Sequence, residues 1–211
     1  RLEGPFWKER LDTVLSESIP SQHAKLEEMT ILASLKLPQP PPPLVIPRHA
    51  NGFSVQVFWD SDVGKWIEAA SYALAHRRDP AIEAQIEAVI DDLEAAQAPD
   101  GYLNCWYLDR EPQNRWTNLR DNHELYNAGH LLEGALAYFQ TTGRRRFLDV
   151  MQRYLDHIRA TFGTGPGQLD LTCGSSLPSS TMSAAATAGS VRARPQQTAA
   201  ARKRRRCITT I

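Results

Sequence analysis

The sequence predicts an all-α fold, on two observations. Four stretches of the 211-residue chain repeat apolar side chains at three- and four-residue intervals, which is the spacing of one buried helix face. The alternation of apolar and polar residues that marks a half-buried strand is confined to residues 53–59, so sheet content should be slight. Because the helices follow one another as hairpins joined by polar and aromatic loops, we expect a toroid of paired helices or a helical solenoid.

The chain begins with two short amphipathic helices between residues 6 and 37. Residues 38–47 contain six prolines, which lack N–H donors and favour an extended surface connection. Asp60, Ser61 and Asp62 then offer N-cap oxygens for a helix that runs to about Arg77.

A second hairpin arm starts at Asp79-Pro80 and ends at the turn signal of residues 99–101 (P-D-G). Because it follows so tightly, we expect this helix to be the antiparallel neighbour of the one before it. A third helix should begin at Asp121, with Glu124 closing a capping box, and a fourth should follow Thr142-Gly143 and end before Gly163. The apolar stripe predicted to be the core face of the third helix is Leu125, Ala128, Leu132, Leu136 and Phe139.

A second stripe on the third helix is polar where a solvated helix would carry Lys, Glu or Gln. It contains His123, Tyr126, Asn127 and His130, and a concave polar pocket explains it. The alternative is that each histidine satisfies a buried hydrogen bond and that Glu124 only caps the helix. A zinc-protease site is excluded, because the two histidines are seven residues apart, about 10 Å along the axis, too far to share one zinc.

Composition limits the function classes further. The 24 basic and 24 acidic residues balance, but after Gln168 there are seven basic residues and one acid, Asp170. The three cysteines are scattered without metal or disulfide spacing, which predicts a reducing, cytoplasmic location. No apolar run reaches the ~20 residues of a membrane span, and the first residues have no signal-peptide pattern, so we expect no membrane partner.

Three blocks of sequence carry a family resemblance. They are F-W-D-S-D-V-G-K-W-I-E-A (residues 58–69), P-D-G-Y-L-N (residues 99–104) and R-W-T-N-L-R-D-N-H-E-L-Y-N-A-G-H (residues 115–130). In this order they resemble the amino-terminal part of glycoside hydrolase family 127, the β-L-arabinofuranosidase-like proteins, from Gly4 to Gln168. The resemblance implies that residues 1–168 are part of an (α/α)6 barrel.

The resemblance also implies a chemistry. Members release terminal β-L-arabinofuranose with retention, using a cysteine thiolate held on zinc as nucleophile and a glutamate as acid/base. In the family these groups lie downstream of the region matched here, so we expect no catalytic residue, metal ligand or cofactor in this chain, and zinc only in longer members. The chain alone should be inactive and should recognise an L-arabinofuranose-containing oligosaccharide.

The resemblance assigns sugar contacts to His123 and His130, with Trp59, Asp60, Asp62 and Trp66 as weaker candidates. For Trp66 we favour core packing, because it belongs to the apolar stripe of its helix.

Residues 169–211 form a low-complexity basic tail that lacks aromatic residues and hydrophobic periodicity, which predicts disorder. We favour a shifted reading frame as its origin over a nucleic-acid-binding or targeting tail, since Arg202 to Arg206 lack interleaved aromatics. Helix faces left without neighbours should expose apolar patches and promote aggregation or oligomers. The alternative to an enzyme fragment is a non-catalytic helical carbohydrate-binding or interaction module.

Overall fold

Helices dominate the parts of the chain that the computed structural model describes, residues 4–39 and 54–170. These residues form no strand; an isolated bridge pairs Phe162 with Leu169, and the alternating stretch before Trp59 is a 3-10 helix, Val55–Phe58. The all-α class is thereby confirmed. Within the same residues, no helix is both long and apolar enough to span a membrane. The predicted proline-rich connection, from residue 40 on, and the predicted tail, from residue 171 on, lie outside the described ranges.

The amino-terminal helices are continuous, whereas we predicted two separate ones. Helix α1 (Pro5–Thr13) passes through a π turn (Val14–Ser18) into α2 (Ile19–Glu28). The π turn widens the helix just before Pro20, whose ring would otherwise crowd the carbonyl group of Ser16. A 3-10 turn, Ala33–Leu35, follows and buries Leu35 completely.

The next two helices are α3 (Trp59–Leu74) and α4 (Pro80–Ala96). The start of α4 confirms the prediction, because Asp79 caps it by accepting hydrogen bonds from the N–H groups of Ala81 at 3.0 Å and Ile82 at 3.2 Å. Helix α3 begins earlier than predicted. Asp60 and Asp62 therefore lie in its first turn, where their carboxylates face the positive end of the helix dipole, instead of capping it.

A short helix, α5 (Cys105–Asp109), and a 3-10 turn, Pro112–Asn114, lead to α6 (Glu124–Thr142) and α7 (Arg146–Thr161). The predicted capping box is wrong: α6 starts at Glu124, with His123 as its N-cap residue and no side-chain cap. Asp121 lies outside the helix, and the Glu124 side chain turns away from it toward the N–H of Trp116.

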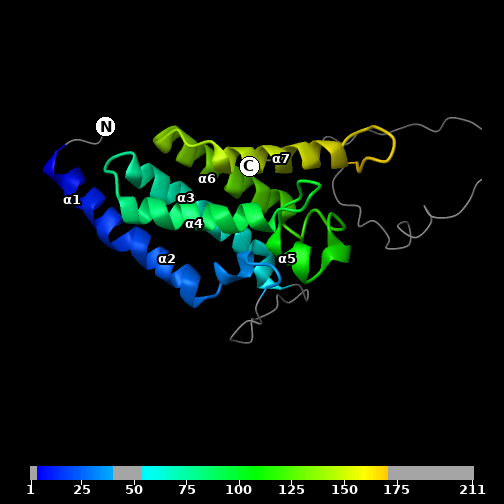
Figure 1. Cartoon of the computed structure of the whole chain (residues 1–211), viewed down its shortest axis with the longest axis horizontal. Coiled ribbons are helices and arrows are strands. Elements are labelled where there is room, and N and C mark those ends of the chain that lie inside the picture. The colour runs from blue at the N-terminus through cyan, green and yellow to red at the C-terminus, as the bar shows by residue number, and fades with distance from the viewer. Residues whose placement is uncertain (1–3, 40–53, 171–211) are drawn as a thin grey trace, which may run out of the picture. The chain divides into compact units, whose positions relative to one another are not determined.

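The closest helix pair joins α3 with α6, which are not consecutive in the chain. The two helices run in the same direction, because Asn127 bonds to Ser61 near both amino ends and Thr141 bonds to Ser71 near both carboxyl ends. We had predicted α4 as the neighbour of α3, whereas the most extensive partner of α3 is α6, and α4 also packs on α7. Figure 1 shows α3, α4, α6 and α7 with their axes roughly aligned.

The core face of α6 differs from the predicted one. Ala128 is buried as expected, but Leu136 is 42% exposed, and Leu125, Leu132 and Phe139 are only partly buried. Helix α6 instead turns Gly134 toward Gly64 and Ile67 of α3. A helix that packs through a small residue approaches its partner closely. Leu131 and Tyr138 of α6 are buried, whereas the four large side chains of the predicted stripe lie on a more open face.

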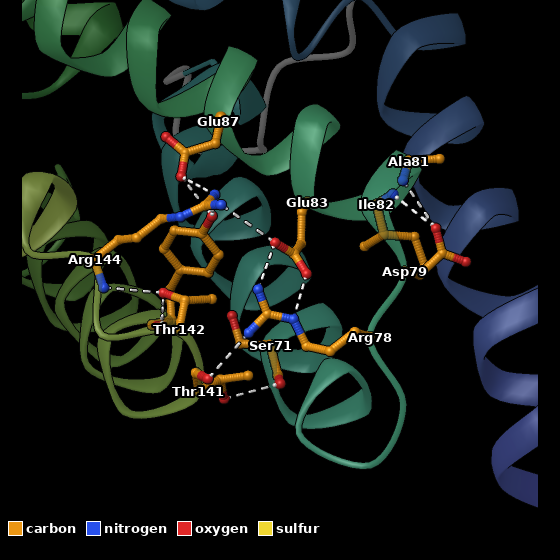
Figure 2. A network of polar contacts seen from close by, with 11 residues as sticks. Ser71, Arg78, Asp79, Ala81, Ile82, Glu83, Glu87, Thr141, Thr142 and Arg144 are labelled. Atoms are coloured by element: carbon orange, nitrogen blue, oxygen red, sulfur yellow. Dashed lines mark hydrogen bonds and ion pairs between the residues drawn. The ribbon is translucent and has the colours of Figure 1, made fainter.

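Ion pairs fix the carboxyl end of the α3–α6 pair (Figure 2). Arg78, after α3, donates two hydrogen bonds to the Glu83 carboxylate of α4, at 2.5 and 2.7 Å. Arg144, between α6 and α7, lies 3.5 Å from Glu83 and donates to Glu87 at 2.7 Å. The α3–α4 connection and the α6–α7 connection are thus both tied to the start of α4, at the end opposite to Asn127.

Candidate functional site

A row of rings lies where α3 and α6 begin. The His123 ring packs edge-on against Phe58 at a centroid distance of 4.3 Å and lies 5.9 Å from the Tyr126 ring. Tyr126 in turn packs edge-on against His130 at 4.6 Å. Tyr126 is 43% exposed, and both histidines are partly exposed. The polar stripe that the sequence singled out is therefore an accessible surface of imidazole and phenol rings.

Asn127 explains why the two helix starts converge. Its side-chain oxygen accepts from the N–H of Ser61 at 3.0 Å, and its side-chain N–H donates to the carbonyl oxygen of Val57 at 2.6 Å. Asn127 is fully buried. The sequence placed it in the polar pocket, but it connects α6 to α3 beneath the ring row.

Lys65 joins the ring row to Asp62. Its ammonium group donates to the Asp62 carboxylate and to the Ser61 hydroxyl, each at 3.2 Å, and lies 5.1 Å from the Tyr126 ring centroid. Partial burial lowers the pKa of Lys65, but hydrogen bonds to Tyr126 and Asp62 outweigh this and raise it above its ordinary value. Sequence reasoning missed Lys65, although its spacing of three residues from Asp62 on one helix was a signal for the pair.

The two histidines have different surroundings. His123 Nδ1 lies 2.6 Å from the carbonyl oxygen of Asp121, within the loop that precedes α6. His130 Nδ1 lies 3.1 Å from the Glu133 carboxylate on the next turn, without being aligned for a hydrogen bond. A neutral imidazole can donate through one nitrogen and accept through the other, so each ring can act as a hydrogen-bond donor or acceptor.

The three remaining candidates lie deeper. Trp66 is 3% exposed and donates from Nε1 to the carbonyl oxygen of Ile19 at 3.2 Å, so the packing interpretation is confirmed for it. Trp59 is 6% exposed. Asp60 is also buried and accepts a hydrogen bond from the N–H of Cys105 at 2.8 Å, which ties α3 to α5. Burial raises the pKa of Asp60 to about 6.

A buried acid lies directly behind His123. Both oxygens of Glu124 accept from the N–H of Trp116, at 3.1 and 2.8 Å, and the Tyr102 hydroxyl donates to one of them. Burial raises the pKa of Glu124 to about 7, against the opposing effect of these hydrogen bonds. Glu124 thus contacts Trp116 and Tyr102, which lie outside its helix, whereas the expected capping box involved only the start of that helix.

The described residues offer no group of three His, Cys, Asp or Glu side chains that could hold a metal ion. The zinc site that the resemblance implies for longer members therefore does not fit these residues. The residues of the row and its neighbours combine exposed ring faces with imidazole, ammonium and carboxylate groups, an arrangement suited to binding a polar ligand.

Comparisons with known proteins agree with the resemblance. The family described as "Beta-L-arabinofuranosidase, GH127 catalytic domain" matches residues 1–190, which extends past Gln168. The non-reducing end β-L-arabinofuranosidase of Bifidobacterium longum subsp. longum is 32% identical over 187 residues, covering 80% of this chain and 28% of that protein.

Two solved structures share the fold. A GH127 β-L-arabinofuranosidase from Geobacillus stearothermophilus T6 is 44% identical, with a TM-score of 0.71 over 80% of this chain and 26% of that one. The GH127 β-arabinofuranosidase BT3674 is 33% identical, with a TM-score of 0.68 over 81% and 27%. The chain thus spans about a quarter of the length of these relatives, and its helices correspond to part of their α/α barrel.

Proposed function

The chain belongs to the family of GH127 β-L-arabinofuranosidase catalytic domains, and on this premise we propose that its described part contributes a sugar-binding wall to hydrolysis of terminal β-L-arabinofuranosides. The observation that supports this most is the partly exposed row of His123, Tyr126 and His130 at the amino ends of two parallel helices. The helices converge there through Asn127, so the row rests on rigid elements.

The chemistry of the row suits a furanose. A sugar presents C–H groups, which pack on ring faces, and hydroxyls, which need fixed donors and acceptors. Tyr126 supplies the exposed ring, the two imidazoles supply hydrogen-bonding nitrogens, and the Lys65–Asp62 pair adds a charged donor and acceptor beside Tyr126. Asp60, Trp59 and Trp66 are all buried, so we do not count them among the sugar contacts.

The family's nucleophilic cysteine, acid/base glutamate and zinc site belong, in this proposal, outside the described residues. Cys105 does not suit the nucleophile: it is buried, and burial raises the pKa of its thiol well above the ordinary value, which disfavours the thiolate. This chain by itself should therefore bind L-arabinofuranose without hydrolysing an aryl β-L-arabinofuranoside. Zinc-dependent turnover by the chain would contradict that placement of the catalytic groups.

The binding test is a calorimetric titration with methyl β-L-arabinofuranoside, a glycoside that holds L-arabinose in its furanose form. We expect His123→Ala and His130→Ala each to weaken binding about tenfold, the effect of losing roughly 1.4 kcal/mol of hydrogen bonding. The matched control is His76→Ala, since His76 is exposed beyond the carboxyl end of α3. Equal affinities of the wild type and the three variants would show that the histidines of the row do not bind the sugar. If a longer protein that contains this chain also binds the sugar without hydrolysing an arabinofuranoside, the alternative is favoured, which is a carbohydrate-binding module.

A further inference from the structure

The loop of residues 116–123 has an unusual backbone conformation at each of its two ends. Trp116 has φ 58° and His123 has φ 56°, both in the left-handed region that non-glycine residues rarely adopt. Such conformations are sterically strained for non-glycine residues and persist only where surrounding contacts over-determine them. The contacts that hold the two ends therefore decide where the His123 ring points.

Hydrogen bonds close this loop on itself. Asn122 donates from its side chain to the carbonyl oxygen of Asn114 at 2.9 Å, and the N–H of Asp121 donates to the side chain of Asn118 at 3.2 Å. The N–H of Trp116 points instead to the Glu124 carboxylate on α6. Glu124 is thus the tie between the first residue of the loop and the first residue of the helix.

Glu124 also sets the direction of its neighbour. Its side chain is 0% exposed and is held from the other side by the Tyr102 hydroxyl, which is also buried. His123 is one peptide bond away, and its ring lies on the accessible side against Phe58. With Glu124 fixed inward and the loop fixed at Trp116, the His123 ring has little freedom to leave the ring row.

We propose that Glu124 is a positioning residue, which holds the His123 imidazole in the sugar-binding row by tying Trp116 to the start of α6. This rests on the proposed function of the row. Glu124 does not touch the sugar; it acts through the backbone of the loop. A carboxylate suits the role because it can accept from the Trp116 N–H and the Tyr102 hydroxyl at once. The side-chain amide of glutamine can keep both contacts, accepting from the N–H and donating to the hydroxyl oxygen.

Histidine ring resonances, assigned in the NMR spectrum of the full chain, test the proposal directly. We expect Glu124→Ala to move the His123 resonances away from the position set by the Phe58 ring, while those of the exposed His76 stay in place. Glu124→Gln should restore the native position of the His123 resonances. Tyr102→Phe removes one hydroxyl from the tie and should move them in the same direction as Glu124→Ala, by less. Tyr138→Phe is the matched control, since it removes a tyrosine hydroxyl bonded to Glu87, outside the ring row.

Affinity for methyl β-L-arabinofuranoside supplies the second readout. We expect a loss of about tenfold in Glu124→Ala, the same as in His123→Ala because the same hydrogen bond to the sugar is lost, and a loss within about twofold in Glu124→Gln. Unchanged His123 resonances in folded Glu124→Ala would overturn the proposal. If that variant does not fold, unchanged resonances in Tyr102→Phe overturn it instead. If the wild-type chain binds no methyl β-L-arabinofuranoside, the proposed function fails, while the His123 resonances still decide the role of Glu124.

Discussion

Gly64 and Gly134 face each other where α3 and α6 pack, so closely that a Cβ atom on Gly134 would lie 2.8 Å from the carbonyl oxygen of Gly64. A Cβ atom on Gly64 would lie 2.6 Å from the carbonyl oxygen of His130. Both contacts are with backbone, which cannot move aside as a flexible side chain can. The position of His130 in the ring row is therefore set by the absence of a side chain on α3.

Gly64→Ala should destabilise the protein by about 1–3 kcal/mol, the usual cost of overpacking a tight contact. The measurement is urea-induced unfolding followed by circular dichroism. Because the new methyl group presses on the His130 carbonyl, the His130 ring resonances should also shift.

Gly129→Ala is the matched control on α6. A Cβ atom there meets nothing within 4 Å, and the residue is exposed. Alanine favours a helix over glycine by up to about 1 kcal/mol, so this variant should be neutral or more stable. A Gly64→Ala protein as stable as Gly129→Ala would show that the α3–α6 contact can relax.

The pKa values of Glu124 and Asp60 predict how stability changes with pH. Burial raises the first from 4.5 to about 7 and the second from 3.8 to about 6. Between the unfolded and folded pKa values the folded protein binds more protons, so the free energy of unfolding falls as pH rises from about 4 to about 7. One pKa unit corresponds to about 1.36 kcal/mol, so each group changes the free energy of unfolding by on the order of 3 kcal/mol at most over this pH range.

Urea unfolding at a series of pH values between 5 and 8 measures this dependence. Glu124→Gln removes the titrating group but keeps its shape, so its stability should vary less with pH than that of the wild type. Glu28→Gln serves as control, since Glu28 is largely exposed on α2. If Glu124→Gln and Glu28→Gln follow the same pH profile, Glu124 does not titrate in this range.

The sequence was a good guide to where helices form and to the buried faces of α3 and α4, but a poor guide to the buried face of α6. Asp79-Pro80 and the apolar spacing of α4 predicted that helix correctly, because capping and periodicity are local properties. The buried face of α6 depends on Gly64 in another helix, and local periodicity carries no information about that partner.

The candidate site could also be predicted only in part from the sequence. The histidine stripe could be predicted because its residue types are unusual for a solvated helix face. The role of Glu124 could not, since its hydroxyl partner, Tyr102, is 22 residues away in the chain and local spacing suggested a capping box.

Leu136 is the clearest case of an apolar side chain on an open face, at 42% exposure in the middle of α6. We expect Leu136→Gln to reduce self-association of the chain, measured by light scattering over a range of concentrations, and to cost no more than about 1 kcal/mol of stability. Leu131→Gln is the contrasting variant, because Leu131 is fully buried on the same helix and its replacement should unfold the protein. Undiminished association of Leu136→Gln would place the associating surface elsewhere.

Arg78 and Arg144 should stabilise the protein cooperatively through the carboxylate that they share. Their side chains are 52% and 48% exposed, so solvent screening limits the loss in Arg78→Ala or Arg144→Ala to about 1 kcal/mol each. The side chain of Glu83 is only 11% exposed. When both arginines are removed, it keeps a desolvated charge without a nearby cation, and the double variant should lose about 1 kcal/mol more than the sum of the single losses.

A double-mutant cycle of urea unfolding measures this coupling, and a third substitution identifies its source. Adding Glu83→Gln to the double variant removes the unpaired charge and should recover part of the lost stability. Arg145→Ala is the control for arginine removal as such, since Arg145 is 66% exposed and pairs with Asp149 on its own helix. Strict additivity of the two single losses would mean that water replaces the arginines at Glu83, and that the ion cluster does not hold the carboxyl ends of α3 and α6 together.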